Sequence, residues 1–98
     1  YTTYFKFTVA ESGTYRIFTN NNGSLDTRGY LYDNVACSTQ LKYNDDAGSS
    51  NTYVGYRYDF YFECQLEAGV EYYLKVTYNV YASNTATSLT LNIQNTAN

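Results

Sequence analysis

Apolar and polar residues alternate along most of this chain with a period of two. The longest run covers residues 54–66, whose even positions are Val54, Tyr56, Tyr58, Phe60, Phe62, Cys64 and Leu66. Such alternation is the pattern of a β-strand with one buried face, and no window keeps the i, i+3, i+4, i+7 spacing of an amphipathic helix. The sequence therefore predicts an all-β protein.

Turn-forming stretches divide the alternation into seven or eight strands. We predict strands at residues 1–9, 14–19, 25–33, 41–45, 54–66, 70–80 and 88–93, the fifth of them either bent or split near Gly55. The stretch Glu11-Ser12-Gly13 predicts a hairpin between the first two strands. Because 98 residues suffice for one modest core, residues 1–98 are predicted to form a single antiparallel β-sandwich.

The charge balance narrows the classes of partner. Six Lys and Arg residues stand against nine Asp and Glu residues, which gives a net charge of −3 and an isoelectric point near 4.6. Nucleic acids and anionic membranes are held through cationic contacts with phosphate, so both are disfavoured as partners. No apolar run approaches the roughly 18 residues of a membrane-spanning helix.

Catalysis finds little support in the residue types. The chain has no histidine, which excludes nucleophile systems of the Ser–His and Cys–His kinds. Cofactor fingerprints and phosphate-binding motifs such as G-x-x-x-x-G-K do not occur in the sequence. We therefore expect a protein without enzymatic activity.

Two cysteines, Cys37 and Cys64, leave two interpretations open. A disulfide between them would close a loop of residues 37–64 and stabilise the fold by about 3.5 kcal/mol in the chain-entropy model. Alternatively both are free thiols, since Cys64 falls on the apolar side of its strand, where an unpaired cysteine packs as a small hydrophobic residue.

Hard oxygen ligands gather at strand ends and in one turn. The candidate metal ligands are Asp26, Asp33, Asn44, Asp45 and Asp46. Ca²⁺ binds about six to eight oxygen atoms, some of them from the backbone of irregular loops, so these residues predict a calcium site. The alternative is that Asn44 and Asp45 form Asx-turns and that Asp26 hydrogen-bonds to loop amides.

The chain also contains 14 tyrosines. Tyr30 and Tyr32 are predicted to share a strand face with Arg28, with their rings roughly 6.5–7 Å apart. On the same alternation, Tyr43, Tyr53, Tyr61 and Tyr73 fall on the solvent side. Rings with a polar tip suit a ligand with both C–H and hydroxyl surfaces, and the candidate ligand-binding residues are Arg28, Tyr30, Tyr32, Tyr43 and Tyr53. Alternatively the tyrosines only pair across strands and stabilise the sheet.

Four motifs follow one another in the order ESGTYRI, LDTRGYLYD, YNDDAG and LEAGVEYYLKV. In this order they resemble the bacterial pre-peptidase C-terminal domain family over nearly the whole chain. The resemblance implies a jelly-roll-like β-sandwich that accompanies secreted hydrolases or surface proteins and has no catalytic activity. Some members, including the collagen-binding modules of clostridial collagenases, bind calcium and a polymeric substrate. The matching positions are Gly13, Tyr15, Asp26, Thr27, Leu31, Tyr32, Asp33, Asn44, Asp45, Asp46, Leu66, Ala68, Gly69, Tyr72 and Tyr73.

These observations predict a non-catalytic binding module of a secreted or cell-surface bacterial protein, excised from a larger multidomain chain. The expected partner is a polysaccharide or an extracellular matrix polymer, with neighbouring domains of the parent chain as further contacts. The alternative is a calcium-stabilised structural or adhesive spacer, or a module that binds matrix proteins and no glycan. In that case the tyrosines would only cover the sheet.

Overall fold

The computed structural model of this chain describes residues 2–20, 25–33, 40–45, 47–48, 52–54, 59–80 and 90–97. Seven strands run through these residues: β1 (Thr2–Phe7), β2 (Gly13–Asn20), β3 (Leu25–Tyr32), β4 (Gln40–Asn44), β5 (Tyr61–Leu66), β6 (Tyr72–Val80) and β7 (Thr90–Asn95). None of the described residues is helical, so the all-β prediction is confirmed for them. Across the same residues, no helix has the length and apolar character needed to cross a membrane.

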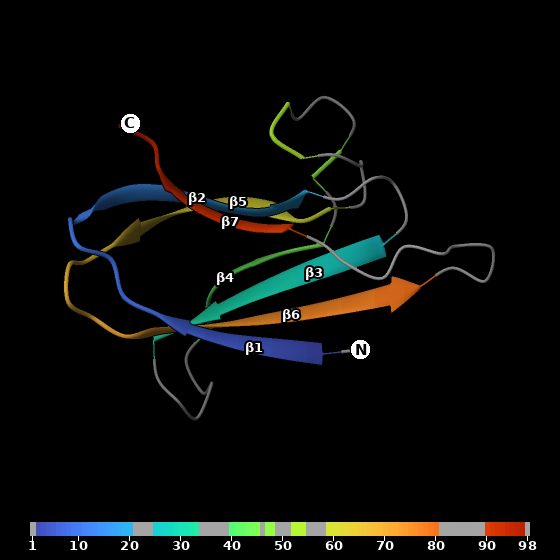
Figure 1. The fold of residues 1–98 in the computed structure, drawn as a ribbon, viewed down its shortest axis with the longest axis horizontal. Helices are drawn as coiled ribbons and strands as arrows, with labels where there is room; N and C mark the ends of the chain where they lie inside the picture. The colour runs from blue at the N-terminus through green and yellow to red at the C-terminus, as the bar shows by residue number, and fades with distance from the viewer. Residues whose placement is uncertain are drawn as a thin grey trace.

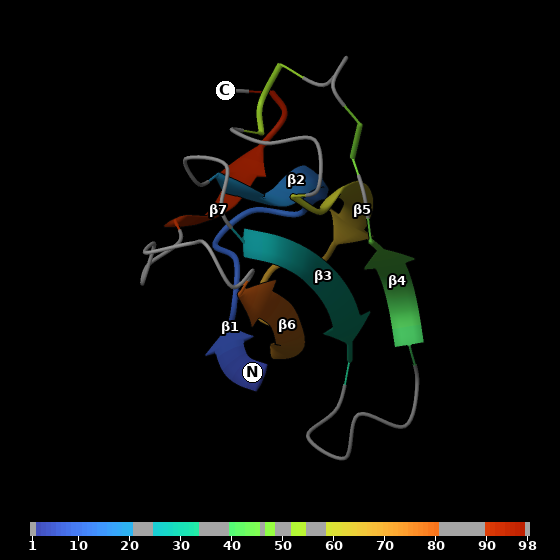
Figure 2. The ribbon, with the colours of Figure 1, turned by 90° about the vertical axis from the view of Figure 1, so that its right-hand side faces the viewer.

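The strands form two sheets, one above the other in Figure 1. The larger sheet has the order β1-β6-β3-β4 and the smaller one the order β5-β2-β7. All neighbouring strands are antiparallel. At one side β4 lies next to β5 (Figure 2), where the backbone N–H of Tyr61 donates a hydrogen bond of 3.0 Å to Asn44 Oδ1. The predicted antiparallel β-sandwich is therefore confirmed.

The predicted hairpin between the first two strands is wrong, because β1 and β2 belong to different sheets. Residues 8–12 carry the chain from one sheet to the other, beside the turn at residues 67–70 that makes the same crossing between β5 and β6. The N–H of Gly69 donates to the carbonyl of Val9 over 3.1 Å, and the N–H of Ala68 donates to Ser12 Oγ over 2.9 Å. Gly69 has a φ of 81°, a conformation that favours glycine.

The core lies between the two sheets and follows the predicted alternation. Its buried members are Val9, Tyr15, Ile17, Leu31, Phe60, Phe62, Leu66, Tyr72, Leu74 and Val76, with Phe5, Phe7, Cys64, Val70, Leu91 and Ile93 packed against them. Phe60 is fully buried, and its ring leaves no room for a side chain on β3, since a Cβ at Gly29 would lie 2.4 Å from it. Glycine at this position therefore lets the ring pack directly on the backbone of β3.

A buried polar cluster joins the two sheets. Thr19 of β2 and Thr27 of β3 are 2.7 Å apart at their Oγ1 atoms, and Thr19 Oγ1 donates to Asp59 Oδ1 over 2.9 Å. All three residues are fully buried. In the predicted strand at residues 54–66, Asp59 is one of the odd positions, which the alternation assigns to the solvent side. That prediction is wrong because β5 begins only at Tyr61, so the backbone before it is free to turn the carboxylate inward.

Candidate functional site

Four residues in register cross the outer face of the four-stranded sheet. Tyr4 pairs with Lys75, Lys75 with Tyr30, and Tyr30 with Tyr43. Directly opposed residues of a sheet share one face, and Phe5, Leu31, Leu74 and Val76, which neighbour three of them along their strands, belong to the core or pack against it. The four residues therefore form one outward-facing line, which we call the tyrosine row.

The two ends of the tyrosine row are its most accessible parts. Tyr4 is 63% exposed and Tyr43 is 45% exposed. Because neighbouring strands lie about 4.8 Å apart, three strand spacings separate these two residues by roughly 14 Å. Between them, the ring centroids of Tyr30 and Tyr43 are 4.8 Å apart, and Lys75 Nζ lies 4.6 Å from the centroid of Tyr30. Two exposed rings thus flank a packed and cationic centre.

An ion pair lies next to the row, where Arg28 precedes Tyr30 by two residues on β3. Arg28 Nε is 3.3 Å from Asp45 Oδ1, and both side chains remain partly exposed. The carboxylate of Asp45, followed by a hydrogen bond with Tyr30, raises the pKa of the Arg28 guanidinium. Arg28 therefore stays charged and shares this face with Tyr30, as predicted, and it offers further donors to a ligand on the row.

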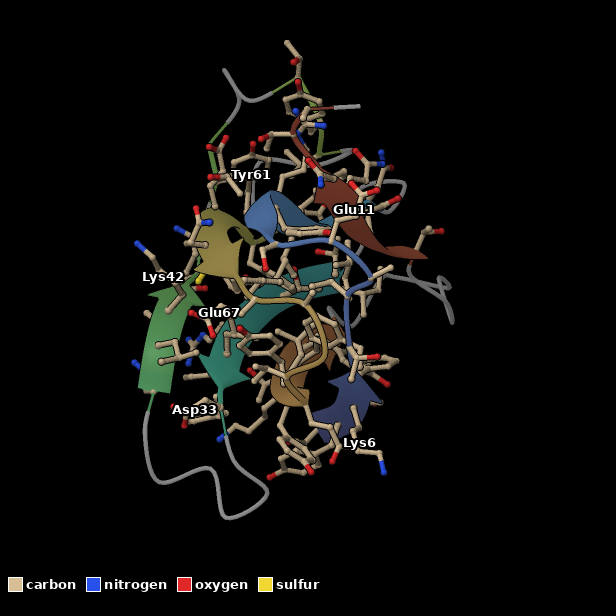
Figure 3. The ribbon with its side chains drawn as sticks, turned by 90° about the vertical axis from the view of Figure 1, so that its left-hand side faces the viewer. Lys6, Glu11, Asp33, Lys42, Tyr61 and Glu67 are labelled. Carbon is tan, nitrogen blue, oxygen red and sulfur yellow. The ribbon has the colours of Figure 1, made fainter. Side chains whose placement is uncertain are left out.

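Among the described residues, the cations on or beside this face are Lys6, Arg28 and Lys75. Lys6 pairs with Glu71 over 3.6 Å, and Arg28 pairs with Asp45. Figure 3 shows Lys6 pointing away from the sandwich below β1. Lys75 is the remaining cation, and it makes no ion pair with any residue that the structure describes. The centre of the tyrosine row thus carries the positive charge of Lys75, which makes a cation–π contact with the ring of Tyr30.

Two of the five predicted ligand-binding residues lie elsewhere. Tyr32 was expected on the surface but is only 7% exposed, because it sits between Tyr73 of β6 and the end of β4, where the register with β3 shifts. Tyr53 is 42% exposed, but it packs on Phe18 of the other sheet. The structure therefore brings together Arg28, Tyr30 and Tyr43 and adds Tyr4 and Lys75 to them.

Tyr53 belongs to a second group of rings, on the outer face of the three-stranded sheet. This aromatic cluster consists of Phe18, Tyr53 and Tyr61, whose three pairs of ring centroids are 5.7–5.8 Å apart. The guanidinium carbon of Arg16 lies 4.4 Å from the centroid of Tyr53, and the hydroxyl of Tyr61 donates to Glu63 over 2.7 Å. Figure 3 shows Tyr61 on the side of the sandwich away from Lys6.

The predicted metal ligands are not gathered into one site. Asp33 directly follows β3, whereas Asp26 is near its start, and seven residues of strand separate them by about 23 Å. Asn44 Oδ1 accepts the hydrogen bond from Tyr61, and Asp45 pairs with Arg28. Asp46 lies outside the described residues. In the part of the chain that is described, no group of three His, Cys, Asp or Glu side chains is placed to hold a metal ion, and the calcium site, which includes Asp46, stays a prediction.

Cys64 is a free, half-buried cysteine packed against the core, and Cys37 lies outside the described residues. Burial raises the pKa of the Cys64 thiol, and the charge of Lys42 opposes this shift. Of the two interpretations of the cysteines, the free thiol describes Cys64 in this structure. A neutral thiol in an apolar environment is a poor nucleophile.

Tyr4 and Lys75 were not among the predicted site residues, although alternation places both on the solvent side. The missing information was the register between β1, β6 and β3, which joins residue 4 to residue 75 and has no local signal in the sequence.

Comparison with known proteins identifies no relative. No family model matches the chain, and neither a curated protein nor a solved structure does. The resemblance to the pre-peptidase C-terminal domain family therefore stays a prediction that rests on the four motifs of the sequence.

Proposed function

We propose that this chain is a non-catalytic module that binds a polysaccharide through the tyrosine row. The observation that carries the proposal is the arrangement of two exposed tyrosines at opposite ends of one register line across a sheet. A face with aromatic rings and polar groups matches a sugar polymer, whose rings present C–H faces and whose edges present hydroxyls.

Binding would begin with sugar rings placed against Tyr4 and Tyr43. The tyrosine hydroxyls and the Arg28–Asp45 pair would then exchange hydrogen bonds with sugar hydroxyls, since this pair supplies both donors and acceptors. Tyr30 supports the site from the neighbouring strand, because its contact with Tyr43 restrains that ring before the ligand arrives. The contact is shallow, so modest affinity for one stretch of polymer is expected.

The four sequence motifs support the placement of this module in a secreted or cell-surface bacterial protein, beside other domains of its parent chain. There it would hold the parent on a polymeric surface. This role needs no chemistry from the module and agrees with its lack of histidine.

The test is a binding screen on immobilised polysaccharides with paired tyrosine variants. Tyr4→Ala/Tyr43→Ala is expected to reduce retention about tenfold or more, since each aromatic contact contributes on the order of 1 kcal/mol. Tyr53→Ala is the matched control, because Tyr53 has nearly the same exposure as Tyr43 but belongs to the aromatic cluster.

The proposal is wrong if no polysaccharide retains the wild-type chain, or if Tyr53→Ala weakens retention while the double variant does not. Thermal melting of each variant shows whether a loss of binding comes from loss of the fold.

A further inference from the structure

Lys75 occupies the centre of the tyrosine row, and its charge is not matched by a neighbouring carboxylate of the described residues. Lys75 Nζ lies over the ring of Tyr30, 4.6 Å from the ring centroid. The other two cations of this face, Lys6 and Arg28, are each paired with an acid. A cation–π contact leaves the ammonium able to donate hydrogen bonds to a further group above the sheet.

The position of this charge matters because the exposed rings lie on either side of it. Tyr4 is the direct partner of Lys75 on β1, and Tyr43 follows Tyr30 on the other side. A sugar chain stacked on both rings would pass over the ammonium. A carboxylate on that sugar would find a positive charge already desolvated in part by the aromatic ring beneath it, which strengthens the attraction.

From this arrangement we infer that the tyrosine row selects a carboxylated polysaccharide, a polymer of uronic acid residues, and that Lys75 binds the sugar carboxylate. The inference rests on the proposed function and names its ligand class. Among the described residues, Lys75 is the one cation of the row and has no paired carboxylate, which suits a polymer with one charge per sugar ring. The net charge of −3 repels every polyanion, and because this repulsion grows with charge density, a densely sulfated chain is disfavoured more than a polyuronate.

The first experiment compares polygalacturonate with its methyl ester, two polymers with the same backbone. The ester removes the charge and keeps the ring faces, so it isolates the contribution of the carboxylate. We expect the wild-type chain to bind polygalacturonate about fivefold more tightly than the ester at low salt, with the advantage falling as salt rises, as for a partly exposed ion pair.

The second experiment removes the cation. Lys75→Gln is expected to bind the acid and the ester equally, and Lys75→Arg to keep part of the preference. Lys42→Gln is the matched control: it deletes the same charge from β4, but Lys42 pairs with Leu31, whose side chain points into the core rather than to the outer face. This variant should keep the full preference.

The outcomes separate the two proposals. Equal binding of acid and ester by the wild-type chain, with binding lost in Tyr4→Ala/Tyr43→Ala, overturns the inference and leaves polysaccharide binding intact. Tighter binding of dextran sulfate than of polygalacturonate also overturns it, because charge density rather than the carboxylate would then decide. Binding of neither polymer, nor of any other polysaccharide, overturns both. The comparison of acid with ester needs no variant, so it stands even if Lys75→Gln fails to fold.

Discussion

The two outer faces of the sandwich both carry tyrosines, but their rings have different neighbours. In the aromatic cluster, Tyr53 and Tyr61 pack on each other and on Phe18. Arg16 lies over the ring of Tyr53, and Glu63 accepts a hydrogen bond from the hydroxyl of Tyr61. In the tyrosine row, the end residues Tyr4 and Tyr43 keep much of their surface open to solvent. Tyr43 and Tyr53 thus have a similar exposed fraction but different neighbours: Tyr43 packs on Tyr30, whereas Tyr53 packs on Phe18 and contacts Arg16. A loss of binding in Tyr43→Ala but not in Tyr53→Ala would show that these neighbours, rather than exposure, decide which ring binds.

The largest difference expected between the two outer faces is in how much a substitution on each face lowers the free energy of unfolding. Phe18 is 3% exposed and lies beneath Tyr53 and Tyr61. Phe18→Ala should lower the free energy of unfolding by about 3 kcal/mol, because it removes a buried ring and leaves a cavity. Tyr4→Ala, on the other face, should change it by no more than about 0.5 kcal/mol. Urea denaturation measures both. Equal losses would mean that the two faces do not differ in the way described.

A smaller effect concerns the ionisation of Tyr61. Burial, followed by the hydrogen bond with Glu63, raises the pKa of Tyr61 above its ordinary value. A raised pKa means that folding favours the neutral phenol. The stabilisation is therefore present below the pKa of the unfolded chain, about 10, and is lost as pH rises through the higher pKa of the folded chain.

Ultraviolet titration of tyrosinate should show this late-ionising group in the wild type and not in Tyr61→Phe. Glu63→Gln should bring the pKa part of the way back, since it removes the carboxylate. If the titration curve of Tyr61→Phe differs from that of the wild type only in amplitude, the contact with Glu63 does not operate in solution.

The smallest effect is expected from calcium. If a metal ion were bound at Asp45, the outer face of the four-stranded sheet would differ from that of the three-stranded sheet in metal binding as well as in its rings. Asp45 already faces Arg28, and Asn44 already accepts a backbone hydrogen bond. Thermal melting after EDTA and then with millimolar calcium should therefore give the same Tm. A rise that Asp45→Ala/Asp46→Ala abolishes would show that the predicted site exists after all.

The sequence predicted the local part of this structure well. Alternation identified the inward residues of β1, β2 and β6, because which face a side chain takes depends only on its position along one strand. The motif positions Tyr15, Leu66 and Tyr72 are likewise buried. Exposure of Tyr43 and Tyr53 followed from the same rule.

The wrong predictions share one cause, which is the pairing of strands that are far apart in the sequence. The Glu11–Gly13 turn has the composition of a hairpin, but whether its two strands pair depends on β5, β6 and β7, which offer each strand another partner. Asp59 was misplaced because Asp59 and Phe60 precede β5 and bond to Thr19 of one sheet and Thr27 of the other, both distant in the sequence. The tyrosine row combines residues from four strands, so no pattern within one segment could have identified it.

The tyrosine row runs from one edge of its sheet to the other, since β1 and β4 are the outer strands and no described strand lies beyond either. If the tyrosine row binds a polymer as proposed, a ligand aligned with it would continue past both edge strands without meeting another described strand. Such a surface would contact the interior of a polymer chain and would not need the ends of the polymer for binding. The module would then hold a long polymer at any point along its length, and its occupancy would scale with total chain length rather than with the number of chain ends.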